Sequence, residues 1–452
     1  MTEHNHASTA AIILAAGRGT RMRSDIPKVL HPVASVPMLA HVMDAAKAAA
    51  CAPLVVVSAP DMPEVAAVAR ARDSHCRIAL QATQQGTAHA VLAAKDSLAD
   101  HTGNVLVLFG DSPLMMPDTF IRMQEMLSRN PALAVVVLGF YTDYPPAYGR
   151  LILDETGTLH RIVEAKDATP DELAIGWCNS GVMAIRGSLV WELLEQIGSN
   201  NAQGEYYLTD IVAVARKLGY QCAVCEGAQD EVLGVNSRAQ LADAEAILQD
   251  RLRLRAMEQG ATLIAPETVY LCADTELGHD VLIEPNVFIG PNVVIGDKVH
   301  IKAFSHIEGT VIGNGASVGP FARLRPGTGV GEDVKIGNFV EIKKAQIEKG
   351  AKISHLSYIG DAHVGEDANI GAGTITCNYD GYKKYHTEIG RDVFIGSNSA
   401  LVAPVVIGAG AYVGAGSVVT ENVEADALAI SRSRQTHKDE WAKNFRKKMD
   451  EK

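Results

Sequence analysis

A glycine-rich turn followed by two basic residues lies near the start of the chain. The segment Leu14–Met22 (LAAGRGTRM) follows the apolar run Ala10–Ala15, and Lys28 comes soon after it. Glycine lets backbone N–H groups approach a phosphate or a base closely, and Arg21 and Lys28 add positive charge. The segment is neither a Walker A loop nor a GxGxxG fingerprint, so an ordinary structural turn stays open beside a phosphate-binding loop.

A carboxylate stands at the end of another apolar run. Asp111 follows Val105–Phe109 in the sequence FGDSPL. Ligands of open α/β sheets bind at the carboxyl ends of the strands, and Mg²⁺ typically takes one or two protein oxygens in addition to substrate phosphates. Asp111 is therefore a candidate magnesium ligand, and the alternative is an aspartate that forms a turn ahead of a proline.

Two cations later in the chain share one position of a repeat. Arg325 and Lys343 are 18 residues apart, and each directly follows an aliphatic residue. In a β-helix whose coil holds three six-residue rungs, such residues stack about 4.8 Å apart along the axis. Stacked cations repel unless an anion bridges them, so we expect a phosphate site. Pairing with a nearby acid such as Glu341 is the alternative.

A histidine and a polar insertion lie next to this column. Counting one slip of the repeat, Gly360 continues the column, and His355 and Tyr358 lie at its edge. Histidine accepts a proton near neutral pH, which the amine nucleophile of an acyl transfer must lose. Residues 376–388 then interrupt the repeat with polar, aromatic and basic side chains, and such insertions are usually functional. A purely structural histidine stays the alternative.

The element that must position these residues is a six-residue repeat. Aliphatic residues recur at this spacing, with occasional slips of one residue, and glycine follows many of them. The repeat positions are Ile283, Ile289, Ile295, Ile301, Ile307, Ile312, Val318, Leu324, Val330, Ile336, Ile342, Ile347, Ile353, Ile359, Val364, Ile370, Ile389, Ile395, Leu401, Ile407, Val413 and Val419. This period predicts a β-helix, in which each short strand gives one apolar side chain to a continuous core.

The first 230 residues follow a different pattern, in which apolar runs alternate with alanine-rich stretches. The expected strands are Ala10–Ala15, Leu54–Ser58, Arg77–Gln81, Val105–Phe109 and Leu133–Phe140. The expected helices are Met38–Ala50, Glu64–Ala71, Thr87–Leu98 and Asp118–Arg129. The alternation predicts a mostly parallel sheet covered by helices on both faces, with a hairpin over Leu151–Leu153 and Leu159–Val163.

A helix of about 237–259 is expected to connect the two parts. Ser237 with Gln240 three residues later indicates a capping box at its start. The expected division is a disordered extension over 1–9, an α/β domain over 10–236, a linker helix over 237–262, a β-helix over 263–431 and a polar tail over 432–452.

Composition limits the classes of function. The chain has 452 residues, 47% of them hydrophobic and 21% charged, which is typical of a soluble globular protein of more than one domain. No apolar run is long enough for a membrane span, and the net charge of −12 argues against general nucleic-acid binding. Seven scattered cysteines and a polar N-terminus suit the cytoplasm. Cys222 and Cys225 form a lone CxxC, for which buried thiols are expected in preference to zinc.

The ordered motifs of the first part resemble those of sugar-1-phosphate nucleotidylyltransferases. They are Leu14–Met22, Pro27-Lys28, Gln81–Thr87, Gly110-Asp111, Tyr148–Arg150, Val163–Asp167, Asn179–Gly181 and Gly234–Asn236. Followed by the hexads and by NIGAGTITCNYDG at 369–381, they resemble the family of bacterial bifunctional N-acetylglucosamine-1-phosphate uridylyltransferases/glucosamine-1-phosphate N-acetyltransferases over about residues 10–441. The resemblance implies a Rossmann-like nucleotidylyltransferase domain and a left-handed parallel β-helix.

For the first domain the resemblance implies Mg²⁺-dependent uridylyl transfer from UTP. The residues that it implies for UTP or UDP-N-acetylglucosamine are Leu14, Gly17, Lys28, Gln81, Gly86, Thr87, Gly149, Glu164, Asn179 and Asn236. Arg21 and Lys28 would bind the triphosphate, and Asp111 and Asn236 would hold the metal. Phe109, where the family often has tyrosine, and Ser35, where glycine is usual, are departures.

For the second domain the resemblance implies acetyl transfer from acetyl-CoA to glucosamine 1-phosphate, with His355 as the general base. The implied sugar-phosphate residues are Arg325, Lys343, Tyr358, Asn369 and Lys384. The implied acetyl-CoA residues are Ala372, Asn378, Tyr379, Ser397, Ala415 and Arg432. The resemblance also implies a homotrimer whose acetyl sites use more than one subunit.

Three functions stay open at this point. The first is a bifunctional enzyme that makes UDP-N-acetylglucosamine for the bacterial envelope. The second is a nucleotidylyltransferase whose β-helix serves only assembly or allostery, against which Arg325, Lys343, His355 and the insertion argue. The third is a non-enzymatic sensor of sugar nucleotides, against which Asp111 with Asn236 argues.

Overall fold

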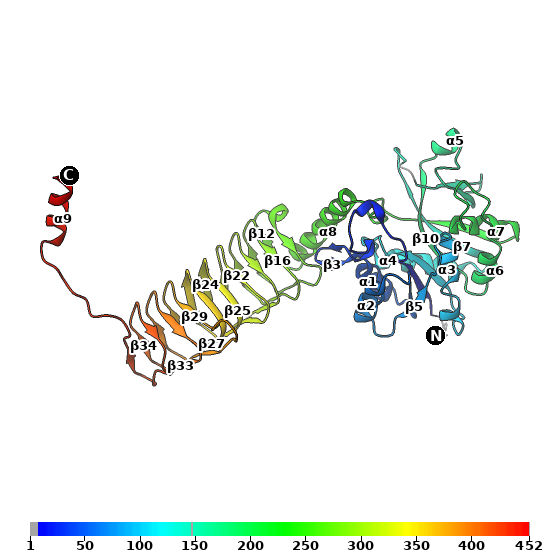
Figure 1. Cartoon of the computed structure of the whole chain (residues 1–452). Helices are drawn as coiled ribbons and strands as arrows, with labels where there is room; N and C mark the ends of the chain where they lie inside the picture. The colour runs from blue at the N-terminus through cyan, green and yellow to red at the C-terminus, as the bar shows by residue number, and fades with distance from the viewer. Residues whose placement is uncertain (1–7, 146–147, 452) are drawn as a thin grey trace. The chain divides into compact units, whose positions relative to one another are not determined.

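The computed structural model describes residues 8–145 and 148–451. The chain divides into two compact units, Met1–Arg251 and Leu252–Lys452 (Figure 1). The division falls inside helix α8 (Arg238–Glu258), which occupies most of the expected linker. No helix within the described ranges is long and apolar enough to cross a membrane.

The first unit is built on a nine-stranded mixed sheet of order β11-β7-β10-β6-β1-β4-β5, with β8 and β9 as a hairpin at β10. The strands are β1 (Ala10–Leu14), β4 (Leu54–Ser58), β5 (Arg77–Leu80), β6 (Val105–Phe109), β7 (Leu133–Tyr141), β8 (Arg150–Leu153), β9 (Leu159–Val163), β10 (Trp177–Ile185) and β11 (Gln221–Glu226). The expected strands and the hairpin are confirmed. Strands β10 and β11 were not predicted, and β10 runs antiparallel to both of its neighbours in an otherwise parallel core.

Helices cover both faces of this sheet because alternate residues of its central strands point to opposite sides. Ala11 and Ile13 of β1 belong to one buried cluster, and Ala10 and Ile12 belong to the other. The first cluster includes residues of α1 (Met38–Ala48), α2 (Pro63–Arg72) and α4 (Pro117–Arg129), and the second includes residues of α3 (Thr87–Leu92), α6 (Val190–Glu195) and α7 (Ile211–Lys217). The smaller elements are η1 (Thr20–Met22), η2 (Lys28–Leu30), β2 (Pro32–Val33), β3 (Val36–Pro37), η3 (Asp96–Leu98), α5 (Pro170–Leu173) and η4 (Leu208–Asp210).

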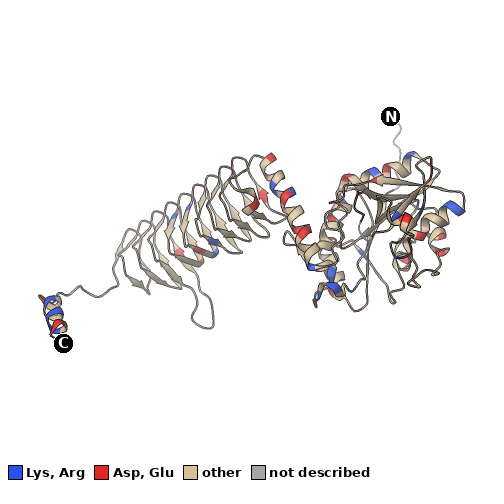
Figure 2. Ribbon diagram, turned by 90° about the horizontal axis from the view of Figure 1, so that it is seen from above, with Lys and Arg blue, Asp and Glu red and all other residues tan. Residues whose placement is uncertain are grey.

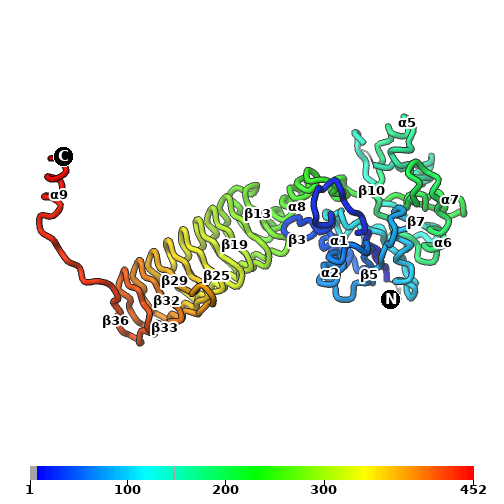
Figure 3. Tube along the Cα trace, viewed as in Figure 1, coloured from blue at the N-terminus to red at the C-terminus, as the bar shows by residue number. Residues whose placement is uncertain are grey.

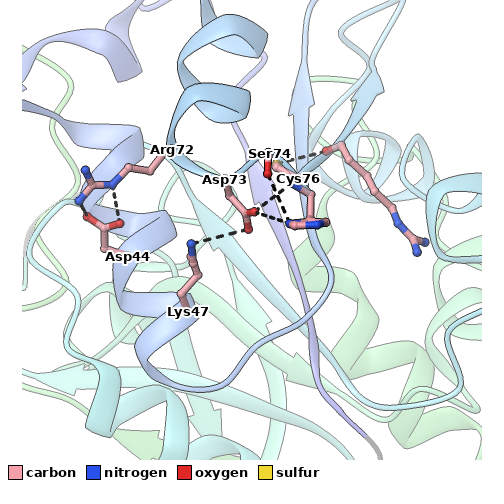
Figure 4. Close-up of polar contacts among 8 residues, drawn as sticks. Asp44, Lys47, Arg72, Asp73, Ser74 and Cys76 are labelled. Carbon is pink, nitrogen blue, oxygen red and sulfur yellow. Dashed lines mark hydrogen bonds and ion pairs between the residues drawn. The ribbon is translucent and has the colours of Figure 1, made fainter.

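Surface ion pairs join α1 to the end of α2 (Figure 4). Arg72 donates from Nε to the carboxylate of Asp44 over 2.7 Å, and Lys47 lies 4.0 Å from Asp73. The side chains of Arg72, Asp44 and Lys47 are between 38% and 47% exposed, so these solvent-accessible pairs contribute little to stability and are not candidates for chemistry.

The CxxC of the first unit is structural. Cys222 and Cys225 both lie in β11, where one belongs to each of the two buried clusters on opposite faces of the sheet. Burial raises the pKa of the Cys222 thiol to about 12. Both thiols are buried, which confirms the expectation. Two cysteines on opposite faces of the sheet cannot bind one metal ion together. None of the seven cysteines, all of which lie in the described part of the chain, forms a disulfide.

The second unit is a parallel β-helix of short stacked strands, coiled regularly along its length (Figure 3). One sheet stacks β12 (Thr262–Leu263), β15 (Leu282–Ile283), β18 (His300–Ile301), β21 (Ser317–Val318), β24 (Lys335–Asn338), β26 (Lys352–His355), β28 (Asn369–Ile370), β31 (Phe394–Ile395), β34 (Tyr412–Val413) and β36 (Leu428–Ala429). Every predicted hexad position is buried, none more than 4% exposed. The six-residue period therefore predicted the core of this unit residue by residue.

The remaining strands form the other two sides of each coil and are recorded together as one fifteen-stranded sheet. They are β13 (Tyr270–Leu271), β14 (Glu276–Leu277), β16 (Phe288–Ile289), β17 (Val294–Ile295), β19 (His306–Ile307), β20 (Thr310–Ile312), β22 (Arg323–Leu324), β23 (Thr328–Val330), β25 (Glu341–Ile347), β27 (Tyr358–Val364), β29 (Ile375–Cys377), β30 (Thr387–Ile389), β32 (Ala400–Val402), β33 (Val405–Ile407) and β35 (Val418–Val419). A short turn, η5 (Pro266–Thr268), precedes β13.

The structure differs at both ends of the chain from the expected disordered extension over 1–9 and polar tail over 432–452. Residues 1–7 lie outside the described part, whereas Thr9 is buried and its carbonyl accepts a hydrogen bond from Ala52 N–H over 2.8 Å. The tail contains a helix, α9 (Trp441–Asp450), that the sequence analysis did not predict. Its residues are exposed, and most of its charged residues are lysine or arginine, coloured blue on the ribbon in Figure 2.

Candidate active sites

A cavity at the carboxyl ends of β1 and β6 brings together most of the predicted nucleotide-binding residues. The predicted residues that line it are Leu14, Gly17, Lys28, Gln81, Gly86, Thr87 and Asp111. The end of β6 lies beside the end of β1 because Gly110 N–H donates to the carbonyl of Leu14 over 3.0 Å. The cavity therefore lies at the edge of the sheet where the parallel strands predicted a ligand site.

Lys28 connects the two predicted metal ligands. Its ammonium forms an ion pair with Asp111 and donates to Oδ1 of Asn236 over 3.0 Å. The side chains of Lys28 and Asp111 are only 12% and 16% exposed. An oxygen of Asp111 and one of Asn236 thus converge on a single small cationic group, although the two residues are 125 positions apart in the sequence.

Backbone contacts fix Asn236 beside Asp111. Val235 N–H donates to the carbonyl of Asp111 over 2.9 Å. The expected capping box is only half present: Gln240 N–H donates to Ser237 Oγ, but the Gln240 side chain accepts from Asn236 N–H over 2.9 Å instead of from Ser237 N–H. This correction has a structural consequence, because the start of α8 holds the backbone of Asn236 directly.

A second cavity opens on the other side of Asp111. Arg21, Asp111, Asn236 and Phe109 line it together. Phe109 lines both cavities, and its ring lies where a Cβ atom on Gly181 would meet it at 2.7 Å. The ring at this position is thus held by close packing.

Three of the four predicted sugar residues lie away from the first cavity: Gly149 precedes β8, Glu164 follows β9 and Asn179 lies in β10, whereas Thr87 lines that cavity. Asn179 N–H donates to the carbonyl of Gly149 over 2.8 Å. Glu164 accepts from Thr209 Oγ1 over 3.1 Å, and burial raises the pKa of its carboxyl. Among the described residues, no hydrogen bond or ion pair links this group directly to Asp111.

Two polar residues that line the first cavity were not among the predicted site residues. Glu205 lines the first cavity from the loop before η4, where no sequence motif marks it. Gln84 lies inside the predicted motif Gln81–Thr87, and its side chain donates to the carbonyl of Ala16 over 2.5 Å, which supports the glycine-rich turn.

The cationic column of the second unit is present. Leu324 pairs with Ile342, and Lys343 pairs with Gly360, so Arg325, Lys343 and Gly360 stack in successive coils. Arg325 forms an ion pair of 2.8 Å with Glu341, as the alternative interpretation expected. Within the described part of the chain, Glu341 forms no ion pair with Lys343. The approach of Lys384 lowers the pKa of Lys343, the charge of Arg325 lowers it further, and the charge of Asp361 acts in the opposite direction to these cations.

His355 is exposed and has an oriented ring. Its Nδ1 lies 2.7 Å from Oδ1 of Asn338 in the preceding coil, in the register that pairs these two residues. An amide oxygen only accepts, so Nδ1 carries the proton and Nε2 keeps its lone pair. Asn338 is a site residue that the sequence analysis missed.

Two predicted site residues converge over Gly360. A Cβ atom at Gly360 would lie 2.4 Å from the hydroxyl of Tyr358 and 2.8 Å from the side-chain nitrogen of Asn378. That amide donates to Asp361 over 2.6 Å, and it keeps a second N–H. The absence of a side chain at Gly360 is what leaves room for both groups next to Lys343.

Three of the six predicted acetyl-CoA residues follow one line along the coils. Ile370, Ile395 and Val413 pair in register, and Ala372, Ser397 and Ala415 each come two residues later. At the end of this line, the side chain of Arg432 is the nearest group to Gly416, at 3.9 Å from a Cβ placed there. The tail residue is thus next to the column at its last coil.

Two predicted residues of the second unit, Asn369 and Tyr379, are not joined to the stacked cations Arg325 and Lys343 within the described part of one chain. Asn369 lies in β28, and among the described residues no hydrogen bond or ion pair joins its side chain to Lys343 or Arg325. Tyr379 is 59% exposed on the insertion, where it forms a bridge with Lys384.

Comparisons with known proteins agree with this two-part architecture. Residues 11–171 match the MobA-like NTP transferase domain family. Residues 274–309, 309–344 and 386–421 match the bacterial transferase hexapeptide family of six repeats. A nucleotidyltransferase domain and a hexapeptide-repeat transferase domain in one chain define a bifunctional transferase.

Curated relatives match over almost the whole length. The chain is 57% identical to the bifunctional protein GlmU of Rhodospirillum rubrum over 98% of both chains, and 54% identical to that of Azorhizobium caulinodans over 97% of both. It is 51% identical to that of Zymomonas mobilis over 99% of both chains. The chain belongs to the GlmU family, as its motifs predicted. A bifunctional family favours two activities over the single-activity and sensor interpretations.

Proposed function

We propose that this chain makes UDP-N-acetylglucosamine in two reactions, one on each unit. The second unit transfers an acetyl group from acetyl-CoA to glucosamine 1-phosphate. The first unit couples the product to UTP and releases pyrophosphate. The observation that carries the proposal is in the second unit, where Arg325 and Lys343 stack in successive coils and Asn338 orients the ring of His355.

In the first unit, the residues of the cavity position two phosphates for in-line attack. Gln81 and Gly86 bind the uracil, Gly17 leaves open space for the nucleotide, and Arg21 and Lys28 bind the triphosphate. Leu14 forms part of the cavity wall, and Thr87, Gly149, Glu164 and Asn179 hold the sugar. The sugar phosphate attacks the α-phosphorus, and pyrophosphate leaves.

Asp111 and Asn236 fit a Mg²⁺ ion. Their oxygens are hard ligands that already converge on one cation, the ammonium of Lys28, and Mg²⁺ needs only one or two protein ligands beside phosphates. The described part of the chain holds no cluster of three or more His, Cys, Asp or Glu side chains that could bind a metal. When bound, the ion supplies positive charge at the phosphate oxygens. The ammonium of Lys28 would then leave the oxygens of Asp111 and Asn236 and pair with the triphosphate.

In the second unit, His355 acts as the general base. Its Nε2 accepts a proton from the amine of glucosamine 1-phosphate as the nitrogen attacks the acetyl carbonyl. Arg325, Lys343, Tyr358, Asn369 and Lys384 hold the sugar phosphate. The Asn378–Tyr379 region stabilises the oxyanion, and the thiol of coenzyme A leaves.

Acetyl-CoA lies along the column of Ala372, Ser397 and Ala415, with Arg432 at its end. We also propose a homotrimer, in which Asn369 and Tyr379 complete sites together with a neighbouring subunit. The β-helix domain is proposed to cover 263–431, after a nucleotidylyltransferase domain over 10–236 and the linker helix. The substrates and the absence of disulfides among the seven described cysteines fit an enzyme of the cytoplasm.

Two point variants test the assignment of one reaction to each unit. His355→Ala is expected to abolish thiol release from acetyl-CoA and to leave pyrophosphate release from UTP unchanged. Asp111→Ala is expected to do the reverse. His75→Ala, whose side chain is 95% exposed, is the control and should change neither rate. Equal loss of both activities in either variant would contradict separate sites.

A further inference from the structure

The side-chain amide of Gln81 has a fixed orientation at the edge of the first cavity. Gln81 is only 5% exposed, and its Nε2 donates to the carbonyl of Gly86 over 3.2 Å. A carbonyl oxygen cannot donate, so the amide nitrogen must face Gly86. Its Oε1 is therefore the group left for a ligand, and no hydrogen bond from any described residue reaches it.

His89 is the second partner of this amide. Its Nδ1 lies 3.2 Å from Nε2 of Gln81. Because the amide nitrogen only donates, Nδ1 must accept, and the neutral ring carries its proton on Nε2. His89 lies on α3, and two hydrogen bonds fix the start of this helix. Ala88 N–H donates to the carbonyl of Tyr206 over 2.9 Å, and Leu208 N–H donates to Thr87 Oγ1 over 2.9 Å.

The backbone of Gly86 supplies a complementary donor. Its φ is 115°, and a Cβ atom there would lie 2.5 Å from the carbonyl oxygen of Tyr206, so only glycine fits. Its N–H makes no hydrogen bond with the described residues. The cavity edge thus presents one N–H donor beside one amide oxygen acceptor.

This pair distinguishes two pyrimidines. Uracil offers a carbonyl oxygen next to a ring N–H and matches both groups. Cytosine offers an amino group next to an unprotonated ring nitrogen and mismatches both. A rotation of the Gln81 amide by 180° would remove the distinction at that position. What opposes this rotation is the acceptor pair formed by Gly86 O and His89 Nδ1.

We propose that His89 is a positioning residue that sets the choice of nucleobase, by holding Gln81 with its carbonyl oxygen toward the base. The proposal rests on the proposed uridylyl transfer and extends it to a residue outside the substrate contacts. His89 selects a nucleoside triphosphate whose ring nitrogen donates a hydrogen bond.

The test compares kcat/KM for UTP and CTP in the full-length protein. His89→Leu removes the acceptor, and the UTP-over-CTP ratio is expected to fall about tenfold, the effect of losing one orienting hydrogen bond. His89→Asn keeps an oxygen that accepts in place of Nδ1 and should restore most of the ratio. His75→Leu at an exposed surface position should leave the ratio unchanged.

An equal fall for UTP and CTP in His89→Leu would overturn the proposal, because it would indicate a merely structural role. So would an unchanged ratio. A second measurement needs no variant: nitrogen NMR of histidine in the wild-type protein should find His89 neutral with its proton on Nε2, and a proton on Nδ1 would refute the contact. If the wild-type protein released no pyrophosphate from UTP, the proposed function itself would fail, and this outcome is separate from the others.

Discussion

Gly360→Ala is a minimal change with a large expected effect on one activity. The added Cβ atom would lie 2.4 Å from the hydroxyl of Tyr358, where ordinary van der Waals contact begins at 3.4 Å. The hydroxyl must therefore move by roughly 1 Å, and the amide of Asn378, at 2.8 Å, must move as well. Displacing catalytic positions by about 1 Å costs on the order of 100-fold in rate.

We therefore expect kcat/KM for acetyl transfer to fall about 100-fold, equivalent to roughly 2.7 kcal/mol. The assay follows thiol release from acetyl-CoA with glucosamine 1-phosphate. Pyrophosphate release from UTP serves as an internal control and should not change. Gly198→Ala, where no atom lies within 4 Å of the new Cβ, should spare both activities. Acetyl transfer within twofold of wild type in Gly360→Ala would show that Tyr358 and Asn378 are not held as described.

Three further predictions concern backbone strain and charge. Ser35 is exposed and has a φ of 64°, a left-handed conformation that strains a residue with a Cβ atom. Ser35→Gly should therefore raise the free energy of unfolding, measured by urea denaturation, by up to about 1 kcal/mol. A loss of stability would contradict this backbone strain. Burial raises the pKa of Glu164 above its ordinary 4.5, so folding stability falls as the pH rises through that interval. Glu164→Gln should raise Tm increasingly above pH 4.5, and a Tm gain that does not vary with pH would be evidence against this. Lys384 lowers the pKa of Lys343, whereas Glu332 raises the pKa of Lys349. An amine-acylating reagent should therefore label Lys343 at lower pH than Lys349, which peptide mass spectrometry can measure. Glucosamine 1-phosphate should protect Lys343 from the reagent. Identical pH profiles for the two lysines would refute the cationic cluster.

The β-helix was predictable because its physical requirement recurs at a fixed spacing. Each rung must bury one aliphatic side chain, and every position predicted on that basis is buried. The same column rule predicted the stack of Arg325, Lys343 and Gly360. Applied once more, it would have found Asn338, which precedes His355 by 17 residues and pairs with it. Asn338 was missed because it is a neutral residue at the end of β24, and its type suggests no chemistry unless its pairing with His355 is known.

The first unit was harder to predict where pairing direction or loops decide the structure. Strand β10 contains the Asn179–Gly181 motif, and its register with β7 shifts between Asn179 and Met183. Apolar periodicity is interrupted there, and periodicity does not encode whether a strand runs parallel or antiparallel. Glu205 lies on a loop whose course depends on the packing of distant elements. Lys28 was predicted as a phosphate ligand, but its contact with both Asp111 and Asn236 required the folded sheet.

The two sites balance charge in opposite ways, and this difference follows from their scaffolds. In the first unit, the sheet edge lets Asp111 neutralise Lys28, so the ligand-free site is charge-balanced and an anionic substrate must compete for that lysine. In the second unit, the regular stacking of coils places Arg325 above Lys343, and the insertion adds Lys384. Glu341 pairs with Arg325, and the charge of Asp361 offsets only part of the effect of Lys384 and Arg325 on Lys343, so the pKa of Lys343 stays lowered. Inorganic phosphate should therefore raise the pKa of Lys343 by relieving the repulsion from these two cations.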